Sequence, residues 1–169
     1  MLKKLRYLLI FLILIIFISC EKQPKKVQND RATLHQDQED AELLRIAENA
    51  RSTLLEFFHH LLRPAKGEKK FMVKYPFKAD SNSGFNMEQI WLSDIQYKDG
   101  VYYGIAANTP FYISAIKKGD RVSFSIEDIS DWMYISGKKI VGAASCKYLL
   151  EQISEHNEEQ QKIFEMLRD

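Results

Sequence analysis

The sequence predicts an α+β fold: one long N-terminal helix packed on a twisted antiparallel sheet of about five or six strands, plus a short C-terminal helix. Three observations predict it. Apolar residues recur with helical period before Pro64, and the period changes to two after Gly67. A weaker helical pattern closes the chain. Because one helix precedes a run of strands with no helices between them, the arrangement is typical of the α+β class.

The long helix is predicted from apolar residues spaced three and four apart, which is the period of one helical face. Acidic residues at its start suit the positive end of the helix dipole. Pro64 and Gly67 are expected to end it. The apolar positions are Leu43, Ile46, Ala47, Ala50, Leu54, Phe57, Phe58 and Leu61.

The sheet is predicted from alternating apolar residues with turn residues between the runs. Asp99-Gly100 lies between two such runs and is a strong signal for a tight hairpin. Ser136-Gly137 is expected to form a second hairpin. The predicted strands cover residues 71–77, 91–97, 101–107, 122–126, 132–135 and 140–150. From Ser154 onward, scattered apolar residues indicate the terminal amphipathic helix.

The first twenty residues have the composition of an export signal. Basic residues precede an apolar run over residues 7–18, and Ser19 precedes Cys20. The run is too short for a membrane span, which needs about 20 residues. The ending Phe17-Ile18-Ser19-Cys20 resembles a lipobox, in which the cysteine is acylated and becomes the first residue. We therefore expect a bacterial lipoprotein, bound through Cys20 and its palmitate to either membrane of the cell envelope.

The rest of the chain divides into a tether and one domain. Residues 20–38 comprise the lipidated cysteine and a polar segment without aromatic residues, which is predicted to be a flexible tether. Residues 39–169 are the right size for a single domain. With Cys20 acylated, Cys146 has no disulfide partner. Its apolar strand pattern predicts a small buried core residue.

The charge balance excludes one class of partner. The chain has 24 basic and 23 acidic residues, and loss of Lys3, Lys4 and Arg6 with the signal leaves 21 against 23. Nucleic-acid binders need a strongly basic surface. We therefore predict no nucleic-acid partner.

Several runs resemble the YegJ-like family, a group of uncharacterised bacterial proteins defined by a domain of unknown function. The most specific run is Asp128-Ile129-Ser130-Asp131-Trp132-Met133-Tyr134. Residues 50–54, 71–77, 89–93, 107–110, 118–122 and 137–142 match as well. The resemblance covers roughly residues 41–150 and implies an exported single domain. It implies no activity.

The acidic residues after residue 119 have two interpretations. Asp128 and Asp131, with Asn108, are candidates for a small envelope hydrolase or a cation-dependent enzyme. The simpler interpretation is turn chemistry, because Asp side chains accept hydrogen bonds from nearby backbone amides. His59 and His60 point about 100° apart on a helix and so predict no metal site. We assign no catalytic residue, metal or cofactor.

Aromatic residues suggest a binding surface. Adjacent pairs such as Tyr102-Tyr103 cannot both face one core, and exposed aromatics stack on sugars or bind proteins. We predict a lipid-anchored, non-enzymatic binding or interaction module, whose partner is an envelope protein or cell-wall ligand. An inhibitor or immunity-type protein is a further alternative. The predicted surface comprises Trp91, Tyr102, Asn108, Asp128, Asp131 and Trp132.

Overall fold

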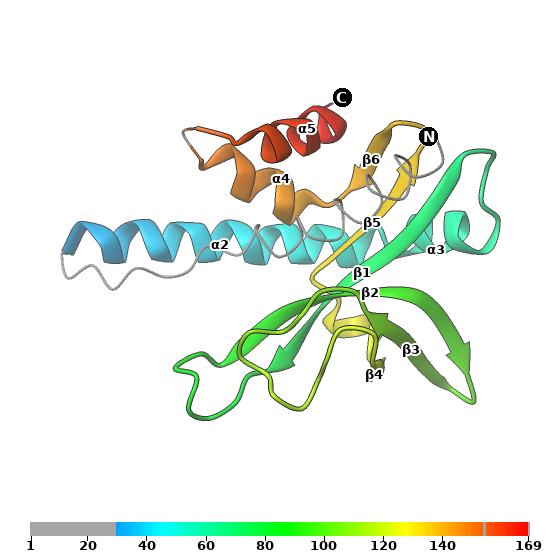
Figure 1. Cartoon of the computed structure of the whole chain (residues 1–169), viewed down its shortest axis with the longest axis horizontal. Coiled ribbons are helices and arrows are strands. Elements are labelled where there is room, and N and C mark those ends of the chain that lie inside the picture. Colours follow the sequence, from blue (N-terminus) through cyan, green and yellow to red (C-terminus); the bar gives the residue numbers. More distant parts are fainter. Residues whose placement is uncertain (1–29, 154, 169) are drawn as a thin grey trace, which may run out of the picture.

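The computed structural model describes residues 30–153 and 155–168, with side chains from residue 41 onward. Within these residues, one six-stranded sheet in the order β4-β3-β2-β1-β5-β6 has only antiparallel neighbours. At the β5-β6 end of the sheet, α2 and α3 pack on one face, and α4 and α5 pack on the other (Figure 1). The strands are β1 (Glu68–Lys78), β2 (Met87–Lys98), β3 (Val101–Ala106), β4 (Arg121–Phe124), β5 (Asp131–Ser136) and β6 (Lys139–Gly142). The helices are α2 (Asp30–Ser52), α3 (Leu54–Leu62), the 3-10 helix η1 (Ile126–Asp128), α4 (Ala144–Glu151) and α5 (Glu158–Leu167).

The predicted single long helix is wrong, because the helical segment is divided at Thr53 into α2 and α3. The hydroxyl groups of Ser52 and Thr53 both donate to the carbonyl of Asn49. Such side-chain bonds compete with the helical backbone pattern. The indole of Trp132 on β5 donates to Ala50 O at 3.2 Å and to Thr53 Oγ1 at 3.0 Å, which fixes the junction against the sheet.

The predicted last strand over residues 140–150 is also wrong. β6 ends at Gly142, and α4 follows. Gly142 and Ala143 both have positive φ, 79° and 54°, and together they turn the chain out of the sheet. A side chain at residue 142 would collide with the carbonyl oxygen of Trp132. Cys146 therefore lies on a helix rather than a strand, although it is buried as predicted.

Both predicted hairpins are confirmed. Lys98 pairs with Val101 across Asp99 and Gly100, whose φ values of 52° and 84° suit a type I′ turn. Ser136 pairs with Lys139 in the second hairpin. The C-terminal helix α5 begins with a capping box between Asn157 and Gln160.

Two hydrophobic clusters lie on opposite faces of the sheet. Along β5, Met133 and Ile135 join the cluster beneath α4 and α5, whereas Trp132 and Tyr134 join the cluster beneath α2 and α3. This is the two-residue alternation of a strand with both faces covered. β5 is accordingly buried along nearly its whole length.

The sheet is not continuous along its whole length. β1 and β2 pair only from Val73↔Leu92 to Lys78↔Met87, so the first part of β1 and the last part of β2 diverge (Figure 1). The register of β1 on β5 shifts between Lys69 and Met72, and that of β2 on β3 shifts between Ser93 and Gln96. Bulges of this kind bend a strand and increase its twist. The divergence leaves a space beneath α3.

The predicted signal peptide, Cys20 and residues 21–29 of the predicted tether lie outside the described residues. α2 begins at Asp30, within the stretch that the composition predicts to be tether. Among the described residues, no helix has the length and apolar character needed to cross a membrane.

Candidate functional site

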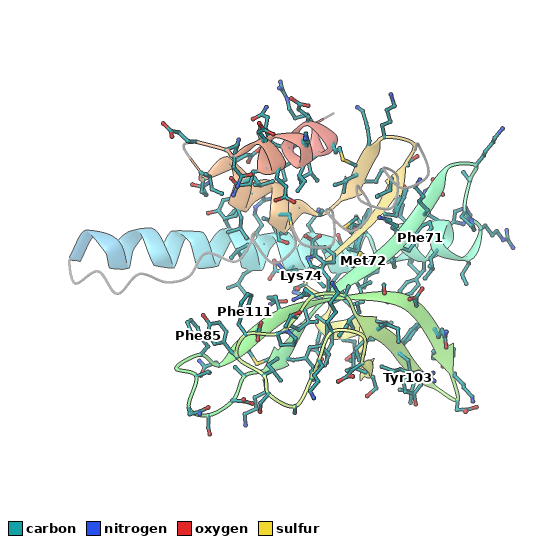
Figure 2. All side chains as sticks on the ribbon, viewed as in Figure 1. Phe71, Met72, Lys74, Phe85, Tyr103 and Phe111 are labelled. Carbon is teal, nitrogen blue, oxygen red and sulfur yellow. The ribbon has the colours of Figure 1, made fainter. Side chains whose placement is uncertain are left out.

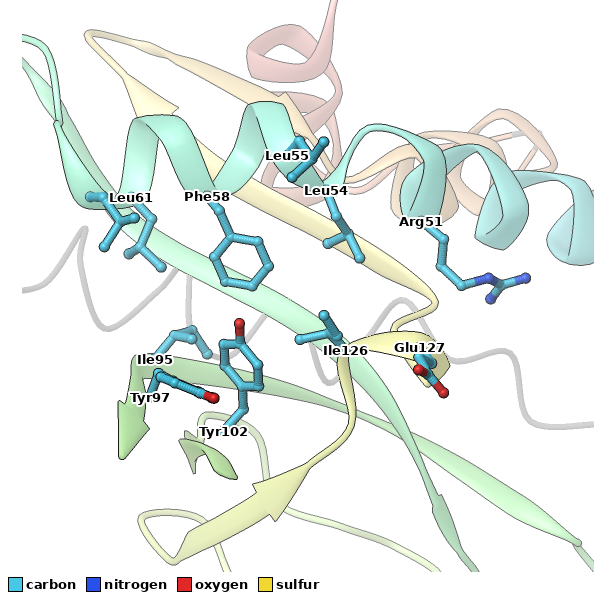
Figure 3. Close-up of a pocket in the computed structure, with 11 residues that line it drawn as sticks. Arg51, Leu54, Leu55, Phe58, Leu61, Ile95, Tyr97, Tyr102, Ile126 and Glu127 are labelled. Carbon is cyan, nitrogen blue, oxygen red and sulfur yellow. The ribbon is translucent and has the colours of Figure 1, made fainter. Parts of the chain in front are cut away.

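An apolar groove of about 740 Å³ lies between α3 and the diverging end of the sheet (Figure 3). One wall comes from α3 and the end of α2, and the facing wall comes from β2, β3 and η1. Its lining residues are Arg51, Leu54, Leu55, Phe58, Leu61, Leu62, Ile95, Tyr97, Tyr102, Ile126 and Glu127. We call this site the apolar groove.

Helix α3 forms its wall because it is apolar on more than one side. Phe57 is fully buried against Phe71 and Trp132 and holds the helix on the sheet. Leu55 and Leu62, by contrast, are 86% and 77% exposed. A helix with a single buried face would carry polar residues at those positions. The exposed leucines therefore call for an explanation beyond the folding of the domain.

Tyr102 supplies a polar group within the groove. Its ring contacts Phe58, Tyr97 and Phe124, with centroid distances between 4.7 and 5.7 Å. Its hydroxyl points toward Phe58 and Ile126 across the groove (Figure 3). Among the described residues this hydroxyl has no hydrogen-bond partner, so it remains available to a ligand.

The charged residues of the lining lie together at one end. Arg51 Nη1 donates to the carbonyl of Ile129 at 3.2 Å, which fixes the guanidinium beside η1. Glu127 lies near it at the same end of the groove (Figure 3). Leu61, Leu62 and Tyr97 form the opposite, apolar end.

The six residues predicted as a binding surface do not form one exposed surface. Trp91 is 1% exposed and Trp132 is 8% exposed, and both belong to the core. Asn108 is buried, and its Oδ1 accepts a hydrogen bond from the backbone amide of Trp91 at 2.8 Å. Asp131 is buried as well. Of the six, Tyr102 lines the groove, and Asp128 is exposed on η1.

The two aspartates considered for catalysis have different surroundings. Asp128 Oδ2 accepts a weak hydrogen bond of 3.4 Å from the hydroxyl of Tyr75. Asp131 accepts hydrogen bonds from its own neighbour Trp132 and from both the amide and the hydroxyl of Ser145, at 2.6 to 2.8 Å. Asp131 thus caps the start of α4. Burial raises the pKa of the Asp131 carboxyl, although the Ser145 hydrogen bonds and Lys74 oppose the rise.

Lys74 and Ser145 complete this buried polar cluster and were not found from the sequence. Lys74 lies near the centre of the sheet (Figure 2), and its Nζ lies 3.4 Å from Ser145 Oγ. A lysine, a serine and a carboxylate are the ingredients of some nucleophilic sites. All three residues are buried, however, so the cluster has no surface at which a substrate meets the serine. Its position indicates that it joins β1, β5 and α4.

Other polar residues in the described part of the chain serve the fold. The carboxylate of Glu88 accepts hydrogen bonds from the backbone amides of Phe111 and Tyr112, both at 2.7 Å. No group of three or more histidine, cysteine or acidic side chains there is arranged to hold a metal ion. His60 Nδ1 lies 3.0 Å from a carboxylate oxygen of Glu68 instead.

Comparison with known proteins identifies the family. Residues 40–166 match the family model described as "Uncharacterized protein conserved in bacteria (DUF2314)". The chain belongs to this family. The YegJ-like resemblance seen in the sequence is thereby confirmed, since the uncharacterized protein YegJ of Escherichia coli K12 is 34% identical over 82 residues. That match covers 48% of this chain and 54% of YegJ.

A second relative is named as a repeat protein. A "Putative ankyrin repeat protein" of Neisseria meningitidis serogroup B is 31% identical over 134 residues, which are 76% of this chain and 53% of that protein. The chain thus spans about half the length of the curated relatives it matches. No solved structure matches it.

Proposed function

We propose that this family member is a lipid-anchored protein of the bacterial cell envelope, and that its domain is a non-enzymatic binding module. The observation that carries the proposal is the open apolar groove beneath α3. Its ligand is an extended apolar molecule of the class of a fatty acyl chain.

The size and lining of the groove support this ligand class. Small-molecule sites have volumes of about 300–1,000 Å³, are mainly apolar and carry a few placed polar groups. The groove, at about 740 Å³, has this character. It follows α3, whose nine residues extend over about 14 Å. An elongated chain fits this shape better than a compact ring does.

The polar groups support a ligand with one polar end. Arg51 is held by the Ile129 carbonyl, and the Tyr102 hydroxyl has no partner among the described residues. A guanidinium and a phenolic hydroxyl are both donors. They suit the carboxylate or ester oxygens of an acyl ligand, while the rest of its chain lies against Phe58, Leu61 and Leu62.

The anchor is proposed from the first twenty residues. A basic start, an apolar run that is short for a span and the sequence Ser19-Cys20 together support acylation of Cys20. An acyl anchor places the domain beside a membrane, which is a source of acyl chains.

A fluorescent fatty acid tests the groove. We expect the full chain to bind it and to enhance its emission. The double variant Leu55→Gln/Leu62→Gln is expected to weaken binding at least tenfold, since each leucine loses apolar contact. Leu44→Gln is the matched control, because Leu44 is an exposed leucine that is not part of the groove. Equal binding by all three proteins would show that the groove is not the site.

Metabolic labelling with a palmitate analogue tests the anchor. Label is expected on the wild-type chain and on Cys146→Ala, and none is expected on Cys20→Ala. Label that survives the Cys20→Ala substitution would refute acylation at that residue.

A further inference from the structure

Five exposed cationic residues gather beside the apolar end of the groove. Arg63, Lys66 and Lys69 come from the α3–β1 connection and the start of β1, and Lys138 and Lys139 come from the β5–β6 turn. The two segments meet where Gly137 N donates to Gly67 O at 3.3 Å. We call these five residues the basic cluster.

The cluster is not neutralised within the described part of the chain. No ion pair there involves any of its five residues. The nearest acidic residue in the sequence is Glu68. Its carboxylate accepts a hydrogen bond of 2.8 Å from the backbone amide of Ala65 and lies 3.1 Å from Nδ1 of His60. Its side chain is turned inward and is only 7% exposed. The chain as a whole carries a formal charge of +1, so these charges are concentrated at one site.

The basic cluster lies next to the end of the groove at which α3 ends. Leu62, at the apolar end of the groove, is followed directly by Arg63 of the cluster. On the facing wall, Tyr97 is 64% exposed and is followed by the exposed Lys98. Exposed apolar side chains and cations are therefore neighbours in the chain at this end of the groove.

We infer that this end of the domain docks on an anionic phospholipid bilayer. Lysine and arginine near an anionic membrane surface are attracted to it, and apolar side chains beside them enter the headgroup region. A nucleic acid would pair with the cations but would leave Leu55 and Leu62 in water. An anionic bilayer pairs with the cations and also takes the two leucines out of water. This inference rests on the proposed function, because it names the source of the acyl chain that enters the groove.

Vesicle binding by the full chain tests the inference. The chain carries Cys20→Ser in all samples, so that no acyl anchor contributes. Partitioning is measured on phosphatidylcholine vesicles and on vesicles that contain phosphatidylglycerol. Residues 1–19, with their apolar run and Lys3, Lys4 and Arg6, are the same in every sample, so a difference between variants isolates the contribution of the cluster.

Two matched charge variants give the decisive comparison. Each lysine near an anionic surface contributes up to about fivefold to the partition coefficient. Lys66→Gln/Lys138→Gln/Lys139→Gln is therefore expected to lower partitioning into the anionic vesicles by about 10- to 100-fold. Lys78→Gln/Lys117→Gln/Lys162→Gln makes the same charge change at exposed lysines outside the cluster and is expected to change it less than threefold. High salt is expected to abolish the difference.

The outcomes separate the two proposals. A preference for anionic vesicles that falls in the cluster variant and not in the matched variant supports the inference. No preference, or equal losses in both variants, overturns it. If the fluorescent fatty acid still binds in that case, the groove function stands and only the bilayer is wrong as its partner. If fatty acid binding fails while the cluster-dependent preference persists, the proposed acyl site falls and docking on the bilayer remains.

Discussion

The two faces of the sheet bury very different groups. Beneath α4 and α5, the face holds a carboxylate, a lysine and a serine, all enclosed. Beneath α2 and α3, the face is almost wholly apolar and rich in aromatic residues, yet it is left open at the groove.

This difference separates chemistry that maintains the fold from surface that is free to bind. The polar groups of the closed face form hydrogen bonds with the backbone. Asp131 accepts a bond from an amide at the start of α4, and Asn108 accepts one from the amide of Trp91. On the open face, exposed leucines have no such role in the domain. The residues most suggestive of catalysis are thus structural, and the candidate site is built from residues that suggest a core.

The largest effect is expected at the residue that attaches α3 to the open face. Phe57→Ala removes a fully buried ring in contact with Phe58, Phe71 and Trp132. Such truncations lower the free energy of unfolding by about 3–5 kcal/mol. Urea denaturation measures it, with Leu55→Ala on the exposed side of the same helix as the control. A change in Phe57→Ala no larger than in the control would mean that α3 is not held by its buried side.

A slightly smaller effect is expected on the closed face. Asp131→Ala leaves the amide and hydroxyl of Ser145 and the amide of Trp132 without their acceptor. A buried donor left unpaired is destabilising by about 1–3 kcal/mol, and relief from burying the carboxylate offsets part of this. We expect a loss of about 3 kcal/mol in urea denaturation. We also expect α4 to lose helical structure, which lowers the far-ultraviolet circular dichroism signal of the helices. An unchanged unfolding midpoint would show that Asp131 does not support α4.

The sequence predicted the sheet better than the helices, for a physical reason. Alternation and the Asp99-Gly100 turn are local features, and both hairpins follow from them. At the break at Thr53, the local hydroxyl bonds of Ser52 and Thr53 are joined by a hydrogen bond from the indole of Trp132, about 80 residues away in the chain. The start of α4 similarly depends on Asp131 and on the positive φ of Ala143. Tertiary contacts of this kind leave no periodic pattern.

The candidate site was predicted only in part. Tyr102 was identified because adjacent aromatic residues cannot share one core, and it does line the groove. The groove itself arises from the divergence of β1 and β2, which no local pattern reveals. One usable sign was present: the adjacent leucine pairs at residues 54–55 and 61–62 give the helix a wider apolar arc than one buried face requires.

The pH dependence of stability sharpens the contrast between the faces. Because the pKa of Asp131 is raised by burial, the folded state takes up a proton at a higher pH than the unfolded state does. Its contribution to stability is therefore full below the unfolded pKa of about 3.9 and is lost as the pH rises through the folded pKa. The slope is at most about 1.4 kcal/mol per pH unit.

Asp131→Asn isolates this contribution. We expect thermal unfolding of the wild type to lose stability relative to Asp131→Asn as the pH rises from about 4. A carboxylate kept charged by Lys74 would give the opposite trend, with the wild type gaining on the variant. Asp128→Asn, on the exposed aspartate, is the control and is expected to run parallel to the wild type.

The smallest effect on stability is expected at the groove, where the effect on binding is expected to be larger. Leu62→Gln alters a side chain that is 77% exposed, and surface substitutions change the free energy of unfolding by about 0.5 kcal/mol or less. If the groove binds an acyl chain, the same variant loses affinity several-fold because the ligand would have buried that leucine. Urea denaturation and fluorescent fatty acid titration on one preparation measure the two quantities together. Substitution of a residue such as Phe57, whose role is folding, lowers the free energy of unfolding. Substitution of a residue of the open groove lowers the affinity for the ligand and preserves stability. Loss of stability in Leu62→Gln comparable to that of Phe57→Ala would mean that α3 is a core helix on both sides and that its exposed leucines serve the fold.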